Sequence, residues 1–191
     1  EHYRRCASMP ETGFSPDADF PVIYAEKGIL HFEASFPVPD APFASLCGGE
    51  RANMVCALAS AGGVRDPRGH EAFGLSFENG SLVSRGVSAP ASTPEEGKHA
   101  VDPLLAFFGA QNAGGRRAHD VLFADVLGLK RFRDETGGLT MSPNVASFSD
   151  GVLRVITDIR YPATMKSEQI VALLGGAGVD YRLLHCQAPL F

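Results

Sequence analysis

The sequence predicts an α+β domain, in which antiparallel hairpins form a sheet and helices pack on one of its faces. Two dipeptides that favour tight turns between antiparallel strands, Asn79-Gly80 and Asp150-Gly151, mark the hairpins. Segments of strand and helix character follow one another as strands, helix, strands, helix and strand. No internal repeat or low-complexity tract interrupts this order.

Strand patterns dominate the first half of the chain. Apolar and polar residues alternate over 29–36, after a turn at 26–28, which predicts a half-buried strand. Paired glycines within 46–66 indicate that regular structure there is short. Residues 73–77 and 81–85 form the first predicted hairpin around Asn79-Gly80.

A helix is predicted to begin at Thr93, with Pro94 in its first position and Glu96 completing a capping box. Its apolar face would contain Val101, Leu104, Leu105 and Phe108. Pro103 conflicts with this helix, because proline in a helix interior costs about 3 kcal/mol. We therefore expect a kink or an early end at Pro103.

The second half contains a short helix, a hairpin, a helix and a strand. Asp120 is expected to cap the short helix, and 152–161 is the second strand of the hairpin. The last helix ends at Gly175-Gly176, and 179–184 is the final strand. Alternation within 152–161 places three polar residues on one face of that strand: Arg154, Asp158 and Arg160.

Composition limits the classes of partner. The 191 residues can form one sizeable domain or two small ones, and a net charge of -5 gives no reason to expect nucleic acid or an anionic membrane. No apolar run approaches the ~20 residues that span a bilayer. The wide spacing of four cysteines favours reduced thiols and a cytoplasmic location over a disulfide framework. Both ends of the sequence are interpreted as cuts through a longer protein.

Three segments could carry chemistry, and each has a simpler interpretation. Asp17 and Asp19, two residues apart, could bind a cation or could form a solvated turn. Residues 86–97 could bind an anion before a helix or could only cap that helix. Arg160 could grip a carboxylate as a fork, or could pair on the surface with Asp158 or another neighbour. The six histidines are scattered, without the spacing of metal ligands.

Five motifs, taken together in this order, resemble those of a known family. The motifs are FSPDADFPVIYAEKG at 14–28, GGERANMV at 48–55, GVSAPASTPEEGK at 86–98, SPNV at 142–145 and DIRYP at 158–162. They resemble the lid segment of PepV-like (Xaa-His) zinc dipeptidases, which belong to the aminoacylase/carboxypeptidase metallopeptidase superfamily. The resemblance implies a lid of two ferredoxin-like halves, inserted into a catalytic domain that carries two zinc ions.

The resemblance also implies roles for individual residues. Asp17 matches a metal ligand at the domain junction, Asn53 an asparagine that reaches the substrate, and Arg160 an arginine that holds the C-terminal carboxylate of the substrate. Pro90 stands where the family has a histidine that helps to stabilise the tetrahedral oxyanion. Proline has no donor for this task, and losing such a donor typically costs about 10²–10³ in rate.

No complete catalytic set is present in this chain, because the other metal ligands, a bridging aspartate and a glutamate base of the family belong before Glu1 and after Phe191. The resemblance implies a junction at 1–21, a lid over 22–188 in two subdomains (22–110 and 111–188), and a return to the catalytic domain at 189–191. Expected partners are a dipeptide, the catalytic domain and, in a homodimer, a second copy. Cobalt or manganese could replace zinc.

Two further hypotheses stay open at this stage. The first is a non-catalytic lid-like binding or dimerisation module in an inactive homologue, and Pro90 favours it. The second is a different amidase specificity within the same superfamily. An H-x-D motif before this segment and a Glu-Glu pair just upstream of Glu1 would favour the dipeptidase.

Overall fold

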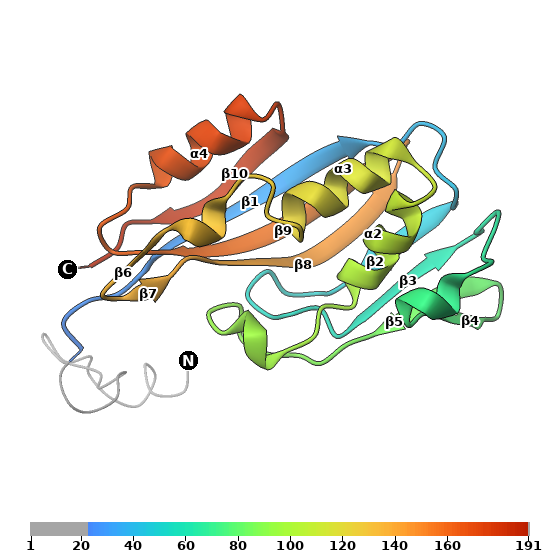
Figure 1. The fold of residues 1–191 in the computed structure, drawn as a ribbon, viewed down its shortest axis with the longest axis horizontal. Helices are drawn as coiled ribbons and strands as arrows, with labels where there is room; N and C mark the ends of the chain where they lie inside the picture. The colour runs from blue at the N-terminus through green and yellow to red at the C-terminus, as the bar shows by residue number, and fades with distance from the viewer. Residues whose placement is uncertain (1–22, 191) are drawn as a thin grey trace, which may run out of the picture.

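The computed structural model describes residues 23–190. Within this range, eight strands form one antiparallel sheet in the order β10-β1-β9-β8-β2-β3-β5-β4 (Figure 1). The strands are β1 (Gly28–Pro37), β2 (Ser45–Gly48), β3 (Leu58–Gly62), β4 (Ser76–Glu78), β5 (Ser81–Arg85), β8 (Thr140–Ser149), β9 (Val152–Tyr161) and β10 (Asp180–Gln187). A separate hairpin pairs β6 (Arg133–Asp134) with β7 (Gly137–Gly138).

Helices α2 (Val101–Gly109), α3 (Ala113–Leu122) and α4 (Ser167–Gly176) complete the α+β fold that the sequence predicts. Short 3₁₀ turns are η1 (His70–Phe73), η2 (Pro94–Glu96) and η3 (Leu129–Arg131). None of the helices within 23–190 is long and apolar enough to cross a lipid bilayer.

The topology contains a ferredoxin-like unit, β1-α3-β8-β9-α4-β10, whose strands lie side by side as β10-β1-β9-β8. Strands β2 to β5 and helix α2 are inserted in this unit between β1 and α3 and extend the same sheet. Strand β1 comes from the range 22–110, yet it pairs with β9 and β10 of the range 111–188. The sheet continues across the predicted boundary between 22–110 and 111–188, so the structure does not locate that boundary and the domain limits stay predictions.

One face of the sheet and the three helices share a single apolar core. Along β1, the residues Leu30, Phe32, Ala34 and Phe36 are buried in it, while the residues between them are half-exposed on the other face. Phe108 of α2, Val121 of α3 and Ile170 of α4 belong to the same cluster. Within residues 23–190, the helices therefore cover one face of the sheet, and the other face, called the open face below, carries none of them.

The predicted hairpin turns are confirmed. Asn79 and Gly80 both have positive φ, 49° and 80°, between β4 and β5. Asp150 and Gly151, at 53° and 73°, join β8 and β9 in the same way. Positive φ at both central residues is the type I′ geometry, which matches the twist of the flanking strands.

Two predicted helix starts are wrong. Thr93 precedes only the 3₁₀ turn η2, and α2 begins at Val101. Pro103 is the third residue of α2 and does not end it, because the first-turn N–H groups have no intrahelical acceptor and proline loses nothing there. Asp120 lies inside α3, which is capped by the Asn112 side chain through Gly114 N and Gly115 N.

Candidate functional site

The loop of Asn53 and the loop of Pro90 both contact β8, close to the position where β8 pairs with Arg160 of β9. The Asn144 side chain donates to the carbonyl of Ala52 in the loop after β2, at 2.5 Å. The next residue of that loop, Asn53, accepts a backbone hydrogen bond from Ala91 at 3.0 Å. Thr140 Oγ1 donates to the Ala91 carbonyl at 3.5 Å and pairs across the sheet with Arg160. The structure thus gathers the segments of Asn53, Pro90 and Arg160 around one stretch of β8.

The SPNV segment (142–145) explains why the loops attach here. The register of β8 with β9 shifts between Pro143 and Val145, a bulge that leaves Asn144 outside the ladder. Proline has no N–H for the ladder and is tolerated at such a bulge. β2 pairs with β8 only at 146–147, so the edge before the bulge is open to the two loops. Asn144 is fully buried there, and Ser142 Oγ donates to its Oδ1 at 2.6 Å.

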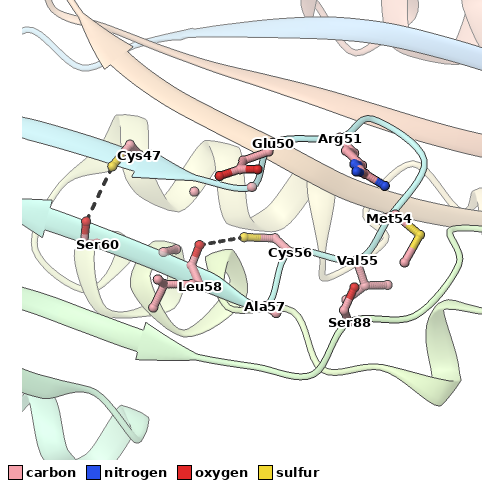
Figure 2. A pocket seen from close by; sticks show the side chains of 13 residues that line it. Cys47, Glu50, Arg51, Met54, Val55, Cys56, Ala57, Leu58, Ser60 and Ser88 are labelled. Atoms are coloured by element: carbon pink, nitrogen blue, oxygen red, sulfur yellow. Dashed lines mark hydrogen bonds between the residues drawn. The ribbon is translucent and has the colours of Figure 1, made fainter.

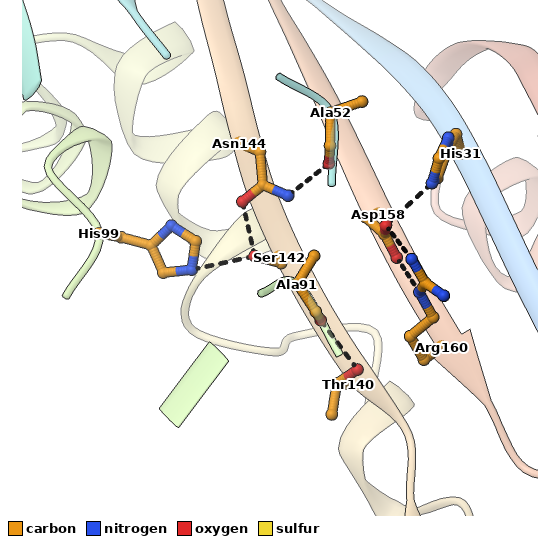
Figure 3. Close-up of polar contacts among 9 residues, drawn as sticks. All are labelled: His31, Ala52, Ala91, His99, Thr140, Ser142, Asn144, Asp158 and Arg160. Atoms are coloured by element: carbon orange, nitrogen blue, oxygen red, sulfur yellow. Dashed lines mark hydrogen bonds and ion pairs between the residues drawn. The ribbon is translucent and has the colours of Figure 1, made fainter. Parts of the chain in front are cut away.

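Arg160, Asp158 and His31 form a connected group on the open face (Figure 3). Arg160 Nε donates to Asp158 Oδ1 at 2.8 Å, and Nη2 donates to Oδ2 at 2.9 Å. His31 Nε2 lies 2.9 Å from the same Oδ2, from the directly opposite position on β1. Arg160 therefore pairs with Asp158 through one edge of its guanidinium, but this pair is not the surface contact that one sequence interpretation expected, because Asp158 is fully buried.

The burial within this group is graded. The Asp158 side chain is 0% exposed, His31 is 19% exposed and Arg160 is 22% exposed. Burying a carboxylate is costly unless it is paired and hydrogen-bonded. Arg160 and His31 supply these partners, and Arg160 still reaches solvent.

Asn53 and Pro90 lie at the surface of the two loops, where both are exposed. Met54 and Pro90 form an antiparallel bridge, and Val55 N donates to the Ala89 carbonyl at 2.8 Å. Backbone hydrogen bonds at Ala89 and Ala91 thus join the two loops on both sides of Pro90. The Pro90 ring adds no polar group at this position.

The predicted metal ligand Asp17 and its neighbour Asp19 lie outside the described residues. Among residues 23–190, no group of three or more His, Cys, Asp or Glu side chains is arranged to hold a metal ion. A catalytic zinc ion needs about three protein ligands. The described residues therefore do not form a zinc site by themselves, and the role of Asp17 stays a prediction.

A hollow of about 520 Å³ opens beside the loop of Asn53, and sequence reasoning missed it. Figure 2 shows Glu50, Arg51 and Met54 of the loop around it, with Cys56 and Leu58 on the side of β3. Burial raises the pKa of the Cys56 thiol, which donates to the Leu58 carbonyl at 3.1 Å. The glycine-rich sequence around 48–49 predicts short regular structure, but not a hollow beside the loop that follows β2.

His99 is a further feature that the sequence did not single out. Its Nε2 lies 3.3 Å from Ser142 Oγ, and its ring meets Phe123 edge-on at 5.6 Å. Nδ1 is buried with no hydrogen-bond partner among the described residues. Burial lowers the pKa of the imidazole, although Asp102 nearby opposes the shift. His99 therefore lies behind the loops in a place where burial disfavours its protonated form.

Comparison with known proteins relates the chain to dipeptidases. No family model matches it. YtjP of Bacillus subtilis (strain 168), a protein named as a dipeptidase, is 32% identical over 205 residues, which cover 89% of this chain and 44% of that protein. The Beta-Ala-Xaa dipeptidase of Lactobacillus delbrueckii subsp. lactis is 24% identical over 85% of this chain and 41% of its own length.

Among solved structures, the aminoacylhistidine dipeptidase from Vibrio alginolyticus matches with a TM-score of 0.37 and 14% identity, over 87% of this chain and 45% of that one. The chain thus spans less than half the length of the curated relatives named above.

Proposed function

From the homology of this chain to part of the curated dipeptidases, we propose that it is the lid and substrate-binding segment of a metal-dependent dipeptidase. The observation that carries the proposal is the geometry of Arg160. Asp158 holds one edge of its guanidinium, and the side chain as a whole is 22% exposed. Thr140, which pairs with Arg160 across the sheet, contacts the loop of Pro90. A guanidinium so placed suits the C-terminal carboxylate of a dipeptide.

Asn53 is the second proposed contact to the substrate. It is exposed on a loop that Asn144 and Ala91 anchor beside Arg160. An amide side chain can donate to a carbonyl and accept from an amine, so it can orient the peptide group of a dipeptide. Holding the substrate at both points would restrict its orientation before reaction.

The two ends of the described segment pair with each other, and the partial coverage of the curated dipeptidases motivates the proposed insertion into another domain. Glu26 N donates to the Leu190 carbonyl at 2.8 Å, and Leu190 N donates back at 3.1 Å. The two flanks of the described sheet therefore lie side by side, a geometry that is compatible with the proposed insertion and is also common in single domains. The partner domain in this proposal is the catalytic domain of the same protein.

The metal of the proposed enzyme is zinc, two ions held mostly by residues outside this chain, with Asp17 as the one contribution from it. Bound zinc polarises a scissile carbonyl and generates a nucleophilic hydroxide at neutral pH. Residues 23–190 have a different task, which is to bind the dipeptide and to exclude water when the lid closes. The free thiols of Cys47, Cys56 and Cys186 fit the proposed cytoplasmic location.

A second candidate function is a non-catalytic lid-like module, for binding or for homodimerisation. Pro90 favours it, because the position expected to stabilise an oxyanion has no donor.

The test is hydrolysis of a dipeptide panel by the full-length protein, before and after metal removal by a chelator. The proposal predicts turnover that chelation abolishes and that added zinc, cobalt or manganese restores. Absence of turnover with every metal, in a folded protein, would favour the non-catalytic module.

A further inference from the structure

We propose that Asp158 and His31 are positioning residues, which turn Arg160 into a preformed fork for a single planar carboxylate. The inference rests on the proposed role of Arg160 in binding the substrate carboxylate. Nothing in the comparisons assigns a role to Asp158 or His31, and neither is expected to touch the substrate.

The geometry of the guanidinium carries the first step. Its five N–H donors are fixed in a plane, and pairs of them form distinct edges that can each bind a carboxylate. Asp158 occupies the side edge made by Nε and Nη2, with distances of 2.8 and 2.9 Å. The end edge, made by Nη1 and the second N–H of Nη2, is left outside this pair. An approaching carboxylate therefore meets one defined edge.

The burial of Asp158 carries the second step. A surface pair between residues two apart on a strand would be mobile and weak. Asp158 is fully buried, so separating Arg160 from it would leave a buried carboxylate without its main partner, which is strongly unfavourable. The guanidinium is thereby tied to the buried carboxylate, while 22% of the Arg160 side chain stays exposed.

His31 holds the carboxylate from the neighbouring strand. It pairs with Asp158 in the β1–β9 register, and its Nε2 binds the oxygen that also accepts from Arg160 Nη2. The His31 ring is tilted against His185 of β10, with 5.4 Å between ring centroids. Packing on β10 and bonding to β9 fix this ring, so the orientation of Arg160 depends on three strands.

The expected consequence is selectivity for a free carboxylate. A planar end edge matches a carboxylate with two parallel hydrogen bonds, whereas a C-terminal amide offers only one acceptor. The test compares the binding of two non-hydrolysed phosphinic dipeptide analogues by calorimetry, one with a free C-terminal carboxylate and one with a C-terminal amide. The full-length protein is used, in unmodified form and as variants.

Asp158→Asn should weaken binding of the free acid by roughly tenfold to a hundredfold, because charge-assisted bonds and their geometry are lost. Binding of the amide should change less than about twofold, and the two should become similar. His31→Gln should weaken binding of the acid by a smaller factor of about three to ten. Glu33→Gln is the matched control: Glu33 lies two residues from His31, bonds Arg182 at 3.2 Å, and should leave both affinities unchanged.

Unchanged or tighter binding of the acid by Asp158→Asn would overturn the positioning role. That result is expected if Asp158 only competes with the ligand carboxylate for the Arg160 guanidinium. If Arg160→Ala still weakens the acid in that case, the proposed function survives and only this inference fails. If Arg160→Ala has no effect, or the unmodified protein binds neither analogue, both fail. If Asp158→Asn does not fold, as judged by circular dichroism, His31→Gln decides the question: unchanged or tighter binding of the acid by this variant would overturn the positioning role.

Discussion

Asn53 and Ala91, which are far apart in the sequence, are joined by a backbone hydrogen bond of 3.0 Å between the Asn53 carbonyl and the Ala91 N–H. This bond fixes the loop of Asn53 against the loop of Pro90. Both loops are in turn held on β8, by Asn144 and Thr140. The site is therefore a set of loops on a rigid sheet, with Arg160 projecting from the next strand.

The first prediction concerns Pro90. If the proposed dipeptidase needs the oxyanion donor that the family resemblance implies at position 90, replacing Pro90 with His should raise the rate of dipeptide hydrolysis by about 10²–10³. The exposed position should tolerate the change. The hydrogen bonds that join the two loops come from the N–H groups of Val55 and Ala91, and neither requires proline at position 90. The control Pro90→Ala removes the ring without adding a donor and should leave the rate unchanged. Steady-state kcat of the full-length variants decides between them, and equal kcat in both would refute the donor argument.

Much of the fold follows from local sequence. Alternation along 29–36 and the turns Asn79-Gly80 and Asp150-Gly151 predict β1 and the hairpins, because period and turn chemistry are local properties. The sequence does not predict where α2 and α3 begin. The capping sequence at Thr93 yields only a 3₁₀ turn, because tertiary contacts of the surrounding loop override local helix propensity. Asn112 carries the overlooked signal for α3, a cap residue before two glycines.

The candidate site is predictable only in part. Period-two alternation places Asp158 and Arg160 on one face of β9, but it cannot show that Asp158 is fully buried. That burial depends on β1 supplying His31 and on β8 and its loops covering the neighbouring positions. Asn53 and Pro90 enter through the family resemblance, and their proximity to Arg160 depends on contacts between distant segments.

The second prediction concerns acid stability. Asp134 accepts hydrogen bonds from Thr136 and Thr164, and these, led by the Thr136 hydroxyl, lower the pKa of its carboxyl to about 2 from an ordinary 3.8. Because the folded pKa is depressed, its stabilisation is complete above about pH 4 and is lost as the pH falls through about 2. The gap in Tm between the unmodified protein and Asp134→Asn should be constant above pH 4 and should shrink toward pH 2. A gap that widens on acidification would contradict this assignment.

The third prediction concerns His99 at mildly acidic pH. Burial lowers the pKa of its imidazole below the ordinary 6.5, so the unfolded chain takes up this proton more readily than the folded one. Stability should therefore decrease as the pH falls below about 6.5. His99→Gln should reduce this decrease, whatever its effect on Tm at pH 7.5. Thermal melts at pH 7.5 and 5.5 measure it, and an identical decrease in both proteins would exclude His99 as the source.

The fourth prediction concerns thiol reactivity. Cys56 is buried, bonded to the Leu58 carbonyl, and has a raised pKa, whereas Cys47 and Cys186 are exposed. Because the thiolate is the reactive form, iodoacetamide at pH 7.5 should label Cys56 at least about tenfold more slowly than the other two. Peptide mapping by mass spectrometry gives the rates, and denaturant should remove most of the difference. Fast labelling of Cys56 in the native protein would place it outside the packed structure.

The measurement that tests the central claim most directly is the KM of the full-length protein for a free dipeptide and for its C-terminal amide, with and without Arg160→Ala. If Arg160 binds the substrate carboxylate, the substitution raises KM for the free dipeptide by about tenfold to a hundredfold and leaves KM for the amide nearly unchanged. An unchanged KM for the free dipeptide would contradict the role of Arg160, and with it the assignment of this segment as the substrate-binding lid.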